Sequence, residues 1–186
     1  MPDIEKDRKD AARRAYLLLQ RDPATWCILD TETTSLYGMV CDLAIIDPQG
    51  NTLINSLINP EAAVSKEARD KHGITDEELS TAPKLTEIWD DLCKSLAGRE
   101  VIIAYNAGFD YGRVAHSASR YKLPMFPQKW GCAMALYAQF YGEWSEWHGN
   151  YKWQTLGGNH RALGDCLATL EKIREMAAEY KEEVAP

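Results

Sequence analysis

The chain has 186 residues, of which 45% are hydrophobic and 26% are charged, and its formal net charge is −7. This composition is typical of a soluble globular protein, and no apolar run approaches the length of a membrane span. The negative charge argues against a protein that coats duplex DNA by neutralising phosphates alone. Residues 1–10 lack the apolar core of a signal peptide, so we expect a cytoplasmic protein without a membrane partner.

The cysteines are odd in number, widely spaced and mostly set among apolar neighbours. They are Cys27, Cys41, Cys93, Cys132 and Cys166. The sequence has no C-x-x-C pair, so buried thiols fit this pattern better than disulfides or a zinc site.

The first expected element is an amphipathic helix over residues 4–20, which ends before Asp22-Pro23. Its basic face consists of Lys6, Arg8, Lys9, Arg13 and Arg14. That face is either a solvated helix surface or a contact for a polyanion. We expect residues 1–24 to form a basic helix appended to a single domain over residues 25–186.

The stretch from Trp26 to Thr34 follows, and the rest of the chain is organised around it. A short apolar run, the pattern of a buried strand, ends in Asp30 and Glu32. Because side chains alternate along a strand, both carboxylates project from one face. Such a pair is either held around a hard cation such as Mg²⁺ or Mn²⁺, or it is a salt-bridged or solvated surface pair.

The later elements predict an α/β fold. Strands over 39–47 and 51–58, joined by Pro48-Gln-Gly50, form an antiparallel meander with the first strand. Strands over 101–104 and 130–133 alternate with helices, which indicates a five-stranded mixed sheet flanked by helices. The expected helices span 61–72, 76–79, 85–96, a segment from about 109, 134–141 and about 162–181.

Two more aspartates and a histidine occupy positions where α/β sheets build their sites. Asp110 opens the helix after the fourth strand, near the carboxyl end of that strand. Asp165 lies in the first turn of the last helix, five residues after His160. Positions i and i+5 of a helix lie about 140° apart, so His160 must precede the helix if both side chains face one cavity. Each aspartate alone could simply favour a helix N-terminus, but that does not explain all five residues together.

Three segments resemble the three exonuclease motifs of the DEDDh 3′–5′ exonuclease family, in order and at suitable separations. They are Asp30-Thr-Glu32-Thr-Thr, Tyr105-Asn-Ala-Gly-Phe-Asp110 and His160-Arg-Ala-Leu-Gly-Asp165. The family includes the proofreading subunit of bacterial DNA polymerase III, ribonuclease T and oligoribonuclease. The segment His72-Gly-Ile-Thr75, followed by Ala82-Pro83, resembles the family's linker between its first two motifs. Two positions depart from the pattern: Ser35 stands where many members have glycine, and Tyr105 where many have histidine.

The resemblance implies a ribonuclease H-like fold and a metal-dependent nuclease. It implies that four carboxylates hold two Mg²⁺ or Mn²⁺ ions, namely those of Asp30, Glu32, Asp110 and Asp165. His160 would be the general base of the attacking water. By motif position, the pocket for the 3′-terminal nucleotide would be lined by Thr33, Leu36, Asn106 and Phe109. The implied product is a nucleoside 5′-monophosphate.

Substrate and partners remain open at this point. We expect a 3′–5′ exonuclease for the 3′ end of single-stranded DNA, acting alone or with a polymerase or repair partner in trans. The alternatives are an exoribonuclease that trims RNA ends or short oligoribonucleotides, and an inactive relative that only binds nucleic acid or protein. The aromatic stretch Trp144 to Trp153 either stacks unpaired bases or packs as core or lid.

Overall fold

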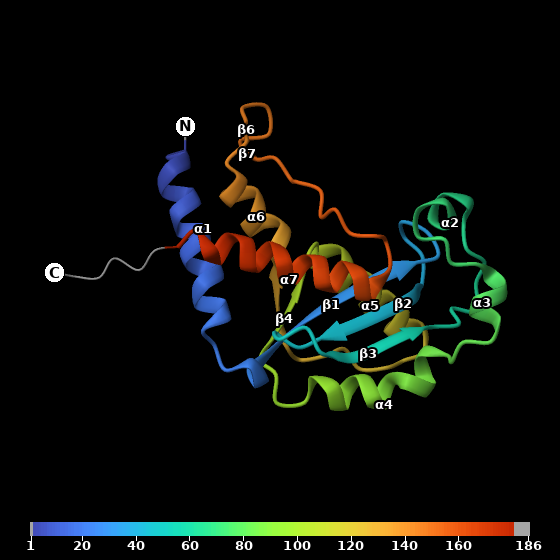
Figure 1. The fold of residues 1–186 in the computed structure, drawn as a ribbon. Helices are drawn as coiled ribbons and strands as arrows, with labels where there is room; N and C mark the ends of the chain where they lie inside the picture. The colour runs from blue at the N-terminus through green and yellow to red at the C-terminus, as the bar shows by residue number, and fades with distance from the viewer. Residues whose placement is uncertain (1, 181–186) are drawn as a thin grey trace.

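The computed structural model describes residues 2–180 and places a five-stranded sheet between two layers of helices (Figure 1). The strand order is β3-β2-β1-β4-β5, with β1 in the centre. The strands are β1 (Trp26–Thr33), β2 (Val40–Ile46), β3 (Thr52–Leu57), β4 (Val101–Ala104) and β5 (Lys129–Cys132). The first three pair antiparallel, whereas β4 pairs parallel with both β1 and β5. The predicted mixed sheet is therefore confirmed.

The helices form two layers and a short insertion. One face of the sheet carries α1 (Ile4–Leu19), α6 (Ala133–Tyr141) and α7 (Ala162–Ala178), and the other carries α4 (Leu85–Leu96) and α5 (Ala107–Arg120). The short helices α2 (Lys66–His72) and α3 (Asp76–Ser80) lie beyond the carboxyl end of β1 (Figure 1). Two minor elements complete the fold, a 3₁₀ turn at Pro23–Thr25 and a hairpin of β6 (Trp144–Ser145) and β7 (Asn150–Tyr151).

The alternation of side chains along β1 decides what each end of the strand faces. Trp26 and Ile28 are buried with residues of α1, α6 and α7, whereas Cys27 and Leu29 are buried with residues of α4 and α5. Because this alternation continues along the strand, Asp30 and Glu32 belong to the α7 face and Thr31 to the α5 face. The central strand thus presents two carboxylates to one helix layer and a hydroxyl to the other.

Helix α1 packs against α6 and α7 through the buried alanines Ala11, Ala12 and Ala15. Part of its basic face is neutralised within the protein, because Arg8 Nη2 lies 2.9 Å from Glu179 Oε2 and Lys9 Nζ lies 2.9 Å from Glu5 Oε1. No helix within residues 2–180 has both the length and the apolar character needed to cross a bilayer.

Some predicted element boundaries were wrong. The helix expected over residues 61–72 begins only at Lys66, because Ser65 caps it by accepting a hydrogen bond from Ala68 N. Before that cap, Glu61 has a positive φ of 50° and its amide donates to Asn59 Oδ1, which is incompatible with a helical turn. The helix expected from about residue 109 begins at Ala107. The expected end of the last helix at residue 181 lies outside the described residues.

The cysteine prediction holds in part. Cys27, Cys41 and Cys166 are buried free thiols, but Cys93 is exposed and Cys132 is half-buried. Cys93 lies in α4, whose buried side chains are Leu85, Trp89, Leu92 and Leu96, so its own position falls outside that stripe.

Candidate active site

A cleft of about 450 Å³ lies at the carboxyl ends of β1 and β4. Because these strands are parallel neighbours, their carboxyl ends meet at the same edge of the sheet, where α/β folds commonly bind ligands. All nine residues predicted from the sequence line this cleft: Asp30, Glu32, Thr33, Leu36, Asn106, Phe109, Asp110, His160 and Asp165. The fold therefore brings together three segments that are far apart in the sequence.

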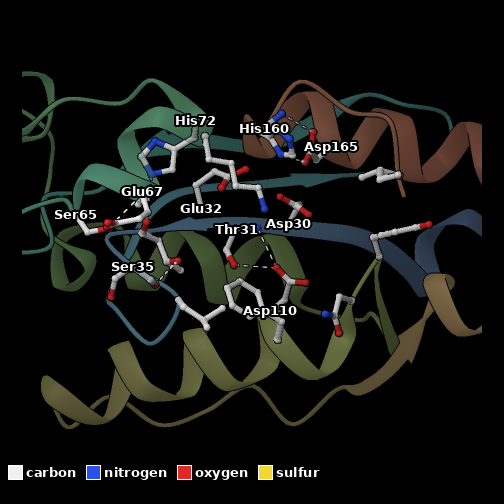
Figure 2. Close-up of a pocket in the computed structure, with 18 residues that line it drawn as sticks. Asp30, Thr31, Glu32, Ser35, Ser65, Glu67, His72, Asp110, His160 and Asp165 are labelled. Atoms are coloured by element: carbon white, nitrogen blue, oxygen red, sulfur yellow. Dashed lines mark hydrogen bonds and ion pairs between the residues drawn. The ribbon is translucent and has the colours of Figure 1, made fainter. Parts of the chain in front are cut away.

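Asp110 reaches the cleft from the first turn of α5. Helix α5 follows β4 directly, and the amide of Asp110 donates to the carbonyl of Asn106 at 3.1 Å. The buried carboxylate accepts two hydrogen bonds from β1, one from Thr31 N at 3.1 Å and one from Thr31 Oγ1 at 2.8 Å. These bonds use Oδ1 twice and fix the carboxylate beside the central strand (Figure 2).

Asp165 and His160 approach from the opposite helix layer. Asp165 lies in the first turn of α7, and its Oδ1 accepts a hydrogen bond from the backbone amide of His160 at 3.1 Å. As predicted, His160 precedes the helix, so that its ring can face the cleft. The imidazole Nδ1 lies 4.0 Å from Asp165 Oδ2, and 48% of the His160 side chain is exposed. Figure 2 shows Asp30 between Asp165 on one side and Asp110 on the other.

Burial and mutual repulsion make it unfavourable for all of these carboxyl groups to be ionised at once. Burial, together with the charges of Asp110, Asp165 and Glu32, raises the pKa of Asp30 well above its usual value. Burial, followed by the charge of Asp165, raises the pKa of Glu32 to about 7. Burial also raises the pKa of Asp110 to about 7, against the opposing effect of the Thr31 hydrogen bonds. Like charges in a desolvated site have this effect unless a cation offsets them.

The donor set fits hard divalent cations. Donor atoms of Glu32, His160 and Asp165 all lie within 4.8 Å of one another, and the charges of Asp110 and Asp165 raise the pKa of Asp30. Carboxylate oxygens are the ligands preferred by Mg²⁺ and Mn²⁺, and a cation among them would remove the repulsion that raises their pKa values. The cleft thus has the chemistry of a metal-assisted hydrolytic site.

The four residues assigned to the terminal nucleotide form the rim of the cleft. The side chain of Thr33 is buried and donates from Oγ1 to the carbonyl of Ser35 at 2.8 Å, which fixes the turn after β1. Leu36, in that turn, is 66% exposed, whereas Asn106 and Phe109 are half-buried at the start of α5. An aromatic ring and an exposed leucine that line the same cleft suit contact with a base.

Helix α2 forms a part of the cleft that was not predicted from the sequence. His72 is buried, its Nδ1 accepts from Ile74 N at 3.0 Å, and its Nε2 lies 3.2 Å from the carbonyl of Thr33. The Nδ1 bond leaves the proton on Nε2, so His72 donates to Thr33 and fixes α2 to the end of β1. Lys71, one residue earlier, is an exposed cation at the cleft. The His72-Gly-Ile-Thr75 segment was a signal for this contact, but nothing in the sequence placed Lys71.

The aromatic stretch lies outside the cleft. Trp144 and Tyr151 pack edge to face with ring centroids 5.2 Å apart, and Tyr151 donates to Asp7 Oδ2 in α1 at 2.7 Å. Trp147 is 91% exposed and Trp153 is 69% exposed, so the prediction that the stretch packs in the core is wrong for these two residues. In Figure 1 the β6–β7 hairpin projects from the end of α6, and the following loop leads back to α7. Base stacking by the hairpin stays a prediction.

Comparison with known proteins identifies the family. The family model described as RNase T exonuclease matches residues 27–172. An uncharacterized exonuclease of Escherichia phage 186 is 33% identical over 172 residues, which cover 80% of this chain and 86% of the phage protein. Exodeoxyribonuclease 10 of Escherichia coli K12 is 29% identical, over 76% of this chain and 64% of its own length. A PolC-type DNA polymerase III of Oceanobacillus iheyensis is 32% identical, over 47% of this chain and only 6% of its own length.

A solved structure agrees in fold and sequence. Exonuclease X, in complex with 5′-overhanging duplex DNA, superposes with a TM-score of 0.57 at 29% identity, covering 83% of this chain and 93% of the other. The nuclease domain of 3′hExo, described as a DEDDh family member bound to rAMP, shares the fold with a TM-score of 0.60 at 12% identity, covering 87% of this chain and 96% of that domain. The ribonuclease H-like fold predicted from the sequence is thereby confirmed. This chain belongs to the exonuclease family and is a 3′–5′ exonuclease of the DEDDh type that acts on nucleic acid.

Proposed function

We propose that this exonuclease hydrolyses the terminal phosphodiester at the 3′ end of single-stranded DNA and releases nucleoside 5′-monophosphates. The observation that carries the proposal is the convergence of four acidic side chains and one histidine in a single cleft. Two of the carboxylates come from the central strand, and one comes from each helix layer. A phosphodiester cleaved beside this cluster must have its charge offset, which the protein's own acidic side chains cannot do.

Four side chains would hold two divalent ions, Mg²⁺ or Mn²⁺: those of Asp30, Glu32, Asp110 and Asp165. Ions bound there supply a water of lowered pKa and offset the charge on the leaving 3′ oxygen. The protein's part is to fix the carboxylates before binding. The bonds from Thr31 to Asp110 and from the His160 amide to Asp165 do this, since each uses one carboxylate oxygen and leaves the other available.

His160 would act as the general base. Its side chain is half-exposed at the cleft, so the imidazole can reach a water near the scissile phosphate, and imidazole is the side-chain group that most often accepts a proton in catalysis. Asp165 Oδ2, 4.0 Å from Nδ1, stabilises the imidazolium that forms. Thr33, Leu36, Asn106 and Phe109 would hold the 3′-terminal nucleotide, with Leu36 and Phe109 against the bases.

We propose DNA rather than RNA as the substrate because of the names of similar proteins and the nucleic acid bound to one of them. The name of Exodeoxyribonuclease 10 states a DNA substrate, and Exonuclease X was solved on DNA. The PolC similarity supports a role beside a polymerase or repair partner in trans. We infer single-stranded DNA because an exposed leucine, Leu36, and the aromatic ring of Phe109 line the cleft and suit contact with an unpaired base.

The test uses DNA and RNA oligonucleotides of equal sequence, labelled at the 3′ or the 5′ end, with Mg²⁺ and with Mn²⁺. We expect the 3′ label to appear first as a mononucleotide, and DNA to be degraded at least 10-fold faster than RNA. His160→Ala should lower kcat by about 100-fold or more, which is the range for loss of a general base. His116→Ala, which changes an exposed histidine of α5 that does not line the cleft, is the matched control and should retain full activity. Faster cleavage of RNA would replace the DNA assignment by the exoribonuclease one.

A further inference from the structure

Asp42 is a buried carboxylate beside the cleft that has no role in the mechanism above. It lies on β2, directly opposite Glu32 in the register of the two strands, and only 2% of its side chain is exposed. Its Oδ2 accepts a hydrogen bond from Arg161 Nε at 3.0 Å and a longer one from Ala162 N at 3.3 Å. Its Oδ1 is buried and has no hydrogen-bond partner within residues 2–180. An unpaired buried oxygen destabilises a fold, so stability alone does not explain a carboxylate at this position.

The two donors to Asp42 form the start of α7. Helix α7 begins at Ala162, and Arg161 occupies its N-cap position without a side-chain cap of its own. A helix begins with amides that have no partner inside the helix, and a nearby acceptor usually satisfies one of them. Here the acceptor comes from a neighbouring strand rather than from the helix itself. Asp42 therefore fixes the first turn of α7 to β2.

His160, the residue before this cap, has a backbone conformation that needs support. Its φ is +56°, a left-handed conformation that is unfavourable for a non-glycine residue because its Cβ comes too close to the following carbonyl oxygen. Such a conformation persists only where contacts on both sides of the residue hold it. On one side the His160 amide donates to Asp165 Oδ1, and on the other Arg161 is held by Asp42.

We propose that Asp42 is a positioning residue that, through Arg161, keeps the His160 imidazole in the cleft. The proposal rests on the function proposed for His160 as general base. Asp42 itself is not among the residues that line the cleft. Loss of its charge would release Arg161, whose side chain is 46% exposed, and allow the His160 peptide to relax towards an extended conformation. The imidazole would then leave the cleft, whereas Asp30, Glu32 and Asp110, which come from β1 and α5, stay in place.

The first experiment compares Asp42→Asn with Asp47→Asn in the full chain. Asp42→Asn keeps the size of the side chain and removes the charge that holds Arg161. Asp47 is the matched control, because it follows the same strand at its other end and likewise accepts backbone amides, those of Gln49 and Asn51 at 2.9 Å. We expect Asp42→Asn to lower kcat 10- to 100-fold with KM changed less than twofold. Asp47→Asn should leave both constants unchanged.

The second experiment asks whether Asp42 acts through His160. Adding Asp42→Asn to His160→Ala should cause no further loss of kcat, because the group being positioned is already gone. A further loss of 10-fold or more would show that Asp42 acts through its strand neighbour Glu32 and would overturn the proposal.

A readout that is independent of activity separates this proposal from the function assigned to His160. The imidazole NMR signals of His160 in the substrate-free protein should shift in Asp42→Asn and stay unchanged in Asp47→Asn. If His160→Ala retained full activity, the general-base assignment would fail, whereas the NMR shift would still show that Asp42 fixes the ring. Unchanged signals in Asp42→Asn would refute the positioning role. If Asp42→Asn does not fold, Arg161→Ala tests the same link from a half-exposed side chain and should give the same shift.

Discussion

Replacing Glu32 by glutamine should stabilise the metal-free protein at alkaline pH, although it removes a proposed metal ligand. Burial and the charge of Asp165 raise the pKa of Glu32 from 4.5 to about 7. The folded protein therefore holds this proton at pH values where the unfolded chain has lost it. Below pH 4.5 the carboxyl group is protonated in both states and folding is not penalised. As the pH rises the penalty grows, and it is complete above about pH 7.

The size of the effect follows from the two pKa values. A pKa difference of this size corresponds to about 3 kcal/mol of unfolding free energy, an upper value because the neighbouring carboxylates titrate together with Glu32. Glutamine has the shape of the acid and no charge at any pH. With EDTA present, Glu32→Gln should therefore exceed the wild type in stability by about 2–3 kcal/mol more at pH 8 than at pH 5.

The assay is urea unfolding followed by fluorescence, at both pH values, for the wild type, Glu32→Gln and Glu67→Gln. Glu67 is an exposed residue at the rim of the same cleft, so its substitution serves as the control and should have no pH-dependent effect. Adding Mg²⁺ at pH 8 should stabilise the wild type much more than Glu32→Gln, because the ion then offsets the buried charge. Equal stability of wild type and Glu32→Gln at both pH values would refute the electrostatic account of the cleft.

Two further predictions concern the packing of the cleft and the reactivity of the thiols. A Cβ atom at Gly158 would collide with Asp165 Oδ1, so Gly158→Ala must displace that carboxylate, and we expect kcat to fall about 100-fold. Gly112→Ala, which enters open space in α5, should keep wild-type kcat in the same oligonucleotide assay. Maleimide should modify the exposed Cys93 of the native protein at pH 7 well before Cys27, because burial raises the pKa of the Cys27 thiol to about 12. Peptide mass spectrometry measures the order of labelling, and early labelling of Cys27 would contradict its burial.

Local patterns were sufficient to predict most of the secondary structure. The apolar run before Asp30 and the alternation of side chains along a strand predicted that Asp30 and Glu32 share a face, and the core packing agrees. The mixed sheet followed from hairpin-length connections in the first third of the chain and helix-length ones after it. The predicted boundaries failed where a side-chain contact set them, as with the Ser65 cap of α2.

The site was harder to predict, because most of its contacts join residues far apart in the sequence. The spacing of His160 and Asp165 was informative, since both belong to one loop and helix turn. Nothing local indicated that Thr31 would hold Asp110 from 79 positions away, or that the hairpin would leave Trp147 exposed.

The sequence by itself determined which groups could do the chemistry: hard oxygen ligands at the end of a buried strand, and an imidazole free to move ahead of a helix. Only the tertiary structure decided how those groups are held. The hydrogen bonds to Asp110 and the link from Asp42 to Arg161 span 79 and 119 positions of the chain. Such contacts form only when the sheet and both helix layers have assembled, because no short-range pattern of residue types encodes which distant donor a buried carboxylate will meet.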